Sequence, residues 1–421
     1  MIEVNKAYKV LLTIILILQF YFFDIIPKIN ELLINANSEY SKKIQLFLFV
    51  IMCFILVFSK KRTMSEKKYF SLPIMFLLIS IFLISIASAK IYDQSMLSTI
   101  STYYSFYLVI AYFPLSYFIS NKENLVWFYG TVVKMSLLYL ILQNIQGIIY
   151  KITHVVFLFY TPIALQNLSM LQRFTEGTEI ITFVAVLISM KPFLLGEKWK
   201  MSDYITLVLV ISFNLFFSQG RMYLMIAIIT ITVSILIQLY TSRHKSLVYI
   251  LSPIIILGIL FLFGKIISML NFTNTTGERS ASYIIRTYSY EYFYQHFFYN
   301  KWFGIGFADP TQYKWLLKGA AGFDAGGGLM TYQDVGMVGT AGILGISGLI
   351  FFAIVVLSLV VFLFKGRNKA IITLILLYIG VSLISLSPLD TGRIFPFVLI
   401  LAISDYSQSS SEEVNKIVKQ I

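Results

Sequence analysis

The chain has 421 residues, of which 58% are hydrophobic, 16% aromatic and only 13% charged. Since its apolar runs are about 20 residues long, the composition excludes an ordinary soluble domain and predicts a helical protein that crosses a membrane several times. The net charge of +13 does not indicate nucleic acid, because the Lys and Arg residues form short clusters between apolar runs. The anionic headgroups of a phospholipid bilayer are the better partner.

The apolar runs predict an all-α fold of about twelve transmembrane helices. In chain order the expected spans are 8–26, 44–58, 70–89, 100–119, 125–149, 179–195, 204–217, 222–240, 247–269, 335–364, 370–386 and 394–403. The first run lacks a small-residue cleavage site and is followed by further spans, so we expect a retained helix rather than a cleaved signal. No internal repeat or linker interrupts the pattern, which predicts a single membrane domain over residues 1–421.

Basic residues gather in alternate loops, and cytoplasmic loops carry the excess of Lys and Arg. The basic loops contain Lys60, Lys61, Arg62, Lys67 and Lys68; Lys191, Lys198 and Lys200; Arg243 and Lys245; Lys365, Arg367 and Lys369; and the terminal Lys6, Lys9, Lys416 and Lys419. With twelve spans, both termini are therefore expected in the cytoplasm. The long polar segment 271–334 then becomes a large extracytoplasmic loop with short helices, and we expect the chemistry of the protein there.

Five arginines fall on the predicted outer face, contributed by different loops or span ends: Arg173, Arg221, Arg279, Arg286 and Arg393. A guanidinium group pairs bidentately with phosphate oxygens and stays charged, so this convergence indicates a site for an anion such as a diphosphate. The alternative is that each side chain reaches separately toward lipid headgroups.

Residues 278–299 have helical spacing, because Arg279, Tyr283, Arg286 and Tyr290 recur at intervals of three or four and so share one stripe. The tyrosine rings of such a stripe suit packing against sugar faces. An interfacial helix lying on the bilayer would show the same mixture of aromatic and basic residues.

Arg221 opens a predicted span at a helix N-terminus, where backbone amides and the helix dipole already favour an anion. A positive side chain is unfavourable there unless an anion lies between the side chain and the helix N-terminus. Asp334 immediately precedes another span, where partial desolvation would increase its basicity. It is the first candidate for a general base, with Glu278 and Glu291 as alternatives, although a solvated loop end would look the same.

Signals for metals and cofactors are missing from the sequence. His154, His244 and His296 show no metal-ligand spacing, and Cys53 is the only cysteine, which excludes an internal disulfide and a cysteine metal cluster. No Gly-rich phosphate loop precedes a basic helix. We therefore expect a protein that uses no metal and no cofactor.

Three segments of the chain resemble motifs of the bacterial O-antigen polymerase and ligase superfamily, the Wzy-type membrane glycosyltransferases. The first is Ser218-Gln219-Gly220-Arg221, which enters a span. The second is Arg286 followed by Tyr290 and the sequence Trp-Phe-Gly-Ile-Gly-Phe at 302–307. The third is Tyr-Gln-Asp-Val-Gly at 332–336, which leads to Gly-Ile-Ser-Gly-Leu at 345–349.

The resemblance implies a polymerase that joins undecaprenyl-diphosphate-linked oligosaccharide repeat units into O-antigen or capsular polysaccharide. It places the active site on the outer face of the bacterial cytoplasmic (inner) membrane. Arg221 and Arg286 would bind the lipid diphosphate, and Asp334 stands where ligases carry a histidine, which favours a polymerase over a ligase. The remaining candidates for substrate binding are Arg173, Glu278, Arg279, Tyr283, Tyr290 and Arg393. An O-antigen ligase and a lipid-linked oligosaccharide flippase are the alternatives, and the sequence leaves open the sugar repeat and any chain-length regulator protein.

Overall fold

The computed structural model describes residues 2–26, 34–35, 38–58, 68–159, 176–241, 280–297, 302–313, 316, 331–366 and 368–418. Its first half contains α1 (Ile2–Gln19), η1 (Phe22–Ile25), β1 (Ile34–Asn35), β2 (Ser38–Glu39), α3 (Tyr40–Phe58), α4 (Ser71–Ile91), α5 (Met96–Thr102), α6 (Tyr104–Tyr107), η2 (Leu108–Ala111), α7 (Tyr112–Ile119) and α8 (Lys122–Thr153). The second half contains α9 (Thr178–Leu194), α10 (Met201–Ser212), η3 (Phe213–Phe217), α11 (Arg221–Thr241), α13 (Ser280–His296), η5 (Tyr332–Asp334), α15 (Gly336–Lys365), α16 (Lys369–Ser385) and α17 (Ile394–Val418). The two short strands pair with each other in antiparallel register.

The architecture is helical, as predicted, and the residues that the structure describes include five helices long and apolar enough to cross a membrane: α3, α4, α8, α11 and α15. Shorter apolar helices cover 104–119, 201–217, 369–385 and 394–409. Each predicted span falls on a helix except 247–269, which lies outside the described residues. The count of twelve spans and the sidedness of the loops stay predictions.

The predicted span 100–119 is a broken helix rather than a continuous one. The 3-10 segment η2 separates α6 from α7. Pro114 in α7 has no backbone N–H and cannot bond to the carbonyl of residue 110, so the regular hydrogen-bond ladder is interrupted at η2.

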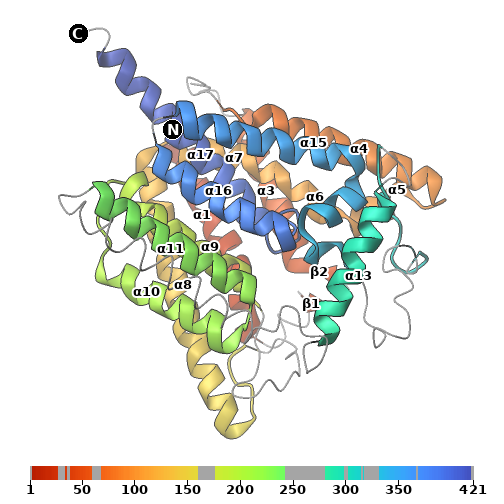
Figure 1. Ribbon diagram of the computed structural model, residues 1–421, viewed down its shortest axis with the longest axis horizontal. Coiled ribbons are helices and arrows are strands. Elements are labelled where there is room, and N and C mark those ends of the chain that lie inside the picture. The colour runs from red at the N-terminus through yellow and green to blue at the C-terminus, as the bar shows by residue number, and fades with distance from the viewer. Residues whose placement is uncertain are drawn as a thin grey trace.

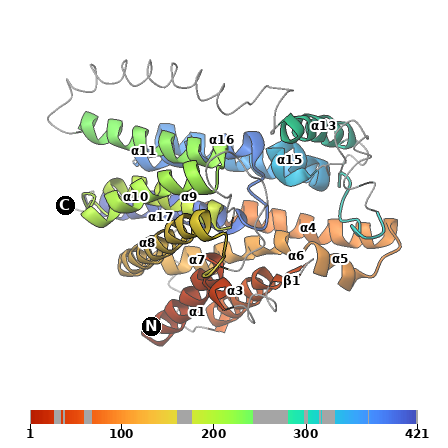
Figure 2. The same ribbon diagram turned by 90° about the horizontal axis from the view of Figure 1, so that it is seen from below.

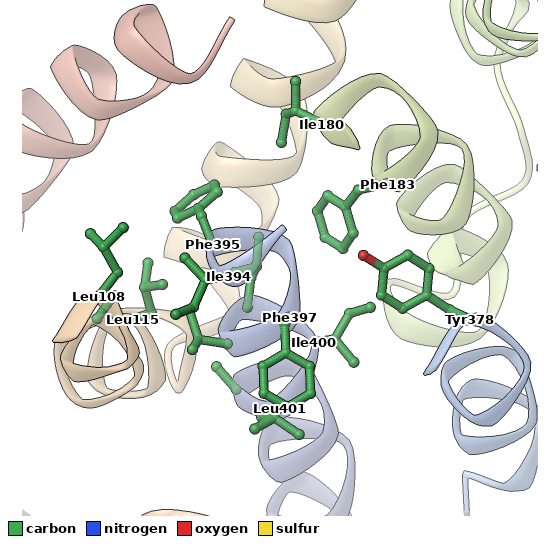
Figure 3. Close-up of a cluster of buried hydrophobic side chains, with 14 of the residues drawn as sticks. Leu108, Leu115, Ile180, Phe183, Tyr378, Ile394, Phe395, Phe397, Ile400 and Leu401 are labelled. Carbon is green, nitrogen blue, oxygen red and sulfur yellow. The ribbon is translucent and has the colours of Figure 1, made fainter. Parts of the chain in front are cut away.

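Helices α9 and α17 form the centre of the bundle. Figure 2 shows them between a layer that contains α11, α16 and α15 and an opposite layer that contains α1 and α3. Figure 1 shows α9 beside α11 and α8. Nearly every residue of α9 is buried, and so is the first part of α17. Figure 3 shows this core, where Phe183 on α9 faces Tyr378 on α16 beside Phe397 and Ile400 of α17.

A buried ion pair fixes one end of α9. The Lys191 Nζ atom lies 2.6 Å from the Asp203 carboxylate of α10, and both side chains are 2% exposed. Tyr129 of α8 donates a hydrogen bond to the same carboxylate at 2.8 Å. The sequence placed Lys191 in a basic cluster at a span end, and the structure shows that its side chain turns into the bundle. Its ammonium group is neutralised inside the bundle, as a buried charge must be.

Helix α15 is broken at Gly345, where φ is 62° and ψ is −149°. The segment that begins at Trp302 fills the break, since Ile305 N donates to the Gly342 carbonyl at 2.7 Å and Gly306 N donates to the Ile343 carbonyl at 3.0 Å. Two of the motif segments thus satisfy each other's backbone groups, which an apolar environment requires wherever a helix is interrupted.

The helix predicted within 271–334 is confirmed as α13. It packs across the first part of α15, where the fully buried Phe293 lies against Gly342. This packing distinguishes α13 from a helix that only lies on a bilayer. The other described residues of 271–334 are 302–313, 316 and 331–334.

Replacing Gly345 by Ala is expected to destabilise the protein. A Cβ atom there would lie 2.6 Å from both the Trp302 carbonyl oxygen and the Gly304 nitrogen, and a positive φ in a non-Gly residue costs about 1–3 kcal/mol by itself. Thermal unfolding of the purified protein in detergent should show a lower midpoint.

The matched control is Gly380→Ala in α16, because Gly380 is exposed and a Cβ there meets nothing within 4 Å. This substitution should leave the midpoint unchanged or raise it. Equal midpoints for the two variants would contradict the tight contact at the break in α15.

Candidate functional site

A cluster of charged and hydroxyl-bearing side chains lies where several helices begin or end, around Arg393. This arginine precedes α17 and is 8% exposed. Its Nε–H donates to the Tyr223 hydroxyl of α11 at 2.8 Å, and Nη1 donates to the Gln333 carbonyl of η5 at 2.8 Å. One guanidinium group therefore joins the ends of three elements that are distant in the sequence.

Two carboxylates neutralise Arg393. Asp390 lies 3.7 Å from Nη1 and Asp334 lies 3.6 Å from Nη2. Asp390 is 8% exposed, and burial raises its pKa even though the Arg393 charge acts in the opposite direction. The side chain of Asp334 is 40% exposed, so it is only partly withdrawn from solvent, and its predicted role as a base stays a prediction.

Glu179 extends the cluster by one more hydrogen bond. Tyr223 accepts from Arg393 and donates its own proton to Glu179 Oε1 at 3.0 Å. Glu179 stands in the first turn of α9. At that helix end the Tyr139 hydroxyl donates to the Glu176 carbonyl at 2.8 Å, and Thr178 donates to Ser218 at 3.0 Å. Together with the ion pair at the other end of α9, these bonds fix the position of the Glu179 carboxylate.

A small pocket opens beside this chain of hydrogen bonds, with room for little more than a water-sized group. Its lining combines charged and hydroxyl groups with a few apolar side chains. The lining residues are Glu179, Thr182, Tyr223, Ile226, Tyr378, Ser382, Leu386, Pro388 and Arg393. Such a lining suits a hydroxyl-bearing ligand, because donors and acceptors converge on one space with apolar walls.

The structure places Arg221 and Arg286 near the same helix ends. Arg221 is the first residue of α11, as predicted, two positions before Tyr223. On α13, Tyr290 donates a hydrogen bond to the Ile384 carbonyl near the end of α16. Burial raises the pKa of Tyr290, and the neighbouring Arg286 charge acts in the opposite direction. The two arginines and Asp334 thus belong to elements that converge on one end of the bundle.

The structure describes the remaining predicted site residues only in part. Arg173, Glu278 and Arg279 lie outside the described residues, and of Tyr283 only the backbone in α13 is described. Glu291 is exposed on α13 and accepts a hydrogen bond from Gln295 at 3.3 Å. The predicted roles of these residues stay predictions.

Sequence reasoning did not single out Glu179, Tyr223 or Asp390. Glu179 and Asp390 are two of several carboxylates on the predicted outer face, and the sequence alone does not rank them. The available signal was the spacing of Asp390 and Arg393, which suits an ion pair three residues apart. Within the described ranges, no group of three or more His, Cys, Asp or Glu side chains is placed to hold a metal ion.

In comparisons with known proteins, no family model matches the chain, and no curated protein matches it. The fold and the site define an all-helical protein with apolar, membrane-compatible helices and a charged pocket where several of them end. The family resemblance rests on the three motifs, and two of these segments contact each other at the break in α15.

Replacing Arg393 by Ala is expected to lower the free energy of unfolding by about 3–5 kcal/mol, because it leaves the buried Asp390 carboxylate without its counter-charge. The measurement is thermal or denaturant unfolding of the purified protein in detergent.

The double variant Arg393→Ala with Asp390→Ala tests the cause of this loss. Its destabilisation should be smaller than the sum of the two single effects, since the buried Asp390 carboxylate is no longer left without its counter-charge. Additive losses would show that Arg393 stabilises the fold independently of Asp390.

Proposed function

We propose that the protein is a membrane glycosyltransferase that polymerises undecaprenyl-diphosphate-linked oligosaccharide repeat units on the outer face of the bacterial cytoplasmic membrane. The observation that carries the proposal is the convergence of Arg221, Arg286 and Asp334 on one end of the bundle, beside a pocket lined by hydroxyl and carboxylate groups. These residues come from the three segments that resemble the polymerase motifs.

In the proposed reaction, a sugar hydroxyl of an incoming repeat unit attacks the anomeric carbon of the growing chain. A new glycosidic C–O bond forms as the C–O bond to the diphosphate breaks, and undecaprenyl diphosphate leaves with the bonding electron pair. A carboxylate of the site accepts the hydroxyl proton. The sequence favours Asp334 for this role, and its carboxylate in η5 is partly exposed.

Arg221 and Arg286 have the chemistry to stabilise the leaving group. A diphosphate gains negative charge as the bond to the sugar breaks, and fixed guanidinium groups lower the energy of that transition state. Arg221 also begins α11, where the first amide groups and the helix dipole add to the attraction for an anion. The lipid tail of such a substrate would remain beside the apolar outer surface of the helices.

Replacing Arg221 or Arg286 by Ala should abolish long glycan chains while the protein is still produced in the membrane. Replacement by Lys should fail as well if bidentate contact with phosphate is required. The measurement is the chain-length ladder of the glycan on a gel in cells that carry each variant. A normal ladder in both Ala variants would refute the assignment.

Lys151→Ala serves as the matched control, because Lys151 is an exposed basic residue in the last turn of α8 and belongs to none of the motifs. Cells that carry this variant should show the same chain-length ladder as cells with the unmodified protein.

Purified protein incubated with a lipid-linked repeat unit in detergent distinguishes the three alternative functions. Elongation supports the polymerase, whereas transfer of finished glycan to another acceptor would support a ligase. No elongation, together with movement of the lipid across vesicles, would support a flippase.

A further inference from the structure

We propose that Glu179, rather than Asp334, is the carboxylate that accepts the proton of the attacking sugar hydroxyl, and that the pocket beside it receives this acceptor hydroxyl. The inference rests on the proposed function and assigns a residue to the one step that the sequence left undecided. It follows from how the two carboxylates are placed relative to Arg393 and to the pocket.

The first argument is the hydrogen-bond arrangement at Glu179. Arg393 donates to Tyr223, and Tyr223 donates to Glu179 Oε1 at 3.0 Å. Because the Tyr223 hydroxyl gives its proton to this oxygen, Glu179 acts there as an acceptor. Among the described contacts no hydrogen bond reaches Oε2, which leaves this oxygen for a ligand donor.

The second argument is the composition of the pocket. Glu179 lines it together with the hydroxyl-bearing residues Thr182, Ser382 and Tyr378. A sugar hydroxyl both donates and accepts hydrogen bonds, so this lining matches a single hydroxyl of an acceptor sugar better than a diphosphate. Charge is consistent with the same division, since the Arg393 charge that also lines the pocket is already balanced by Asp334 and Asp390, while the Glu179 carboxylate attracts an O–H donor.

Asp334 has a different position. Its carboxylate lies 3.6 Å from the Arg393 Nη2 atom and does not line the pocket. The residue before it, Gln333, contributes the carbonyl that accepts from Arg393. Asp334 therefore acts as a positioning residue: it helps to hold Arg393, which orients Tyr223, which in turn orients Glu179.

The proposed step is balanced within the site. The acceptor hydroxyl loses its proton to Glu179 Oε2 as its oxygen bonds to the anomeric carbon, and the diphosphate leaves with the electron pair of the broken bond. The neutral carboxylic acid then returns its proton to water through the opening of the pocket. No further reactant is required.

The test compares Glu179→Gln with Asp334→Asn in purified protein that elongates a defined lipid-linked repeat unit. Glutamine keeps the size of the side chain and still accepts from Tyr223, but it takes up no proton. Glu179→Gln should lower kcat by about 100-fold or more with KM nearly unchanged, as expected for loss of a general base. Asp334→Asn should lower kcat by less than about tenfold, because the partly exposed ion pair contributes little.

Glu179→Gln activity within about threefold of the unmodified protein would overturn the inference and leave the proposed function standing. A larger loss in Asp334→Asn than in Glu179→Gln would also overturn it and return the role of base to Asp334. If the unmodified protein does not elongate the substrate at all, the proposed function itself fails.

Tyr223→Phe keeps the test decisive if Glu179→Gln does not fold. This variant retains the ring and removes only the hydroxyl that connects Arg393 to Glu179. It should lower kcat by about tenfold with no change in KM, and an unchanged kcat would refute the positioning of Glu179 by Arg393 through Tyr223.

Thr182→Val should instead raise KM for the acceptor, since it removes a hydroxyl from the pocket lining.

Discussion

The organisation of the site depends on one buried positive charge that has to be neutralised within the fold. A guanidinium group removed from water is costly unless its donors find partners. Arg393 meets this requirement with Tyr223 from α11, the Gln333 carbonyl from η5, and the carboxylates of Asp334 and Asp390. Because these partners come from separate elements, satisfying Arg393 also fixes the start of α11, the segment η5 and the start of α17 relative to one another.

Irregular backbone occurs where its N–H and C=O groups find hydrogen-bond partners within the fold. The break in α15 at Gly345 leaves the Gly342 and Ile343 carbonyls without helical partners, and the amides of Ile305 and Gly306 supply the missing bonds. Apolar surroundings tolerate such a break only when the backbone groups are paired internally. The same contact anchors the segment that follows α13, so the helix carrying Arg286 and Tyr290 is connected to the first part of α15. Packing of Phe293 against Gly342 strengthens this connection.

The sequence predicted the helices well and their side-chain contacts poorly. Long apolar runs and helical spacing are local properties, and α8, α11, α13 and α15 appear where these signals placed them. Lys191 shows the limit of a charge pattern, because only the fold reveals that Asp203 neutralises it. The link from Arg393 to Tyr223 joins positions 170 residues apart, and the link from Tyr223 to Glu179 joins positions 44 apart. No spacing rule within one element predicts such pairs.

The contacts in the structure distinguish two kinds of arginine that look alike in the sequence. Arg393 was expected to help bind an anion, yet its Nε and Nη1 donors are engaged by protein oxygens and its charge is balanced by two carboxylates. A diphosphate at this position would have to displace those partners and would meet Asp334 and Asp390. Arg221 and Arg286 sit instead on the flanking helices α11 and α13 and remain partly exposed. The fold therefore favours an organising role for the buried arginine over direct contact with an anion.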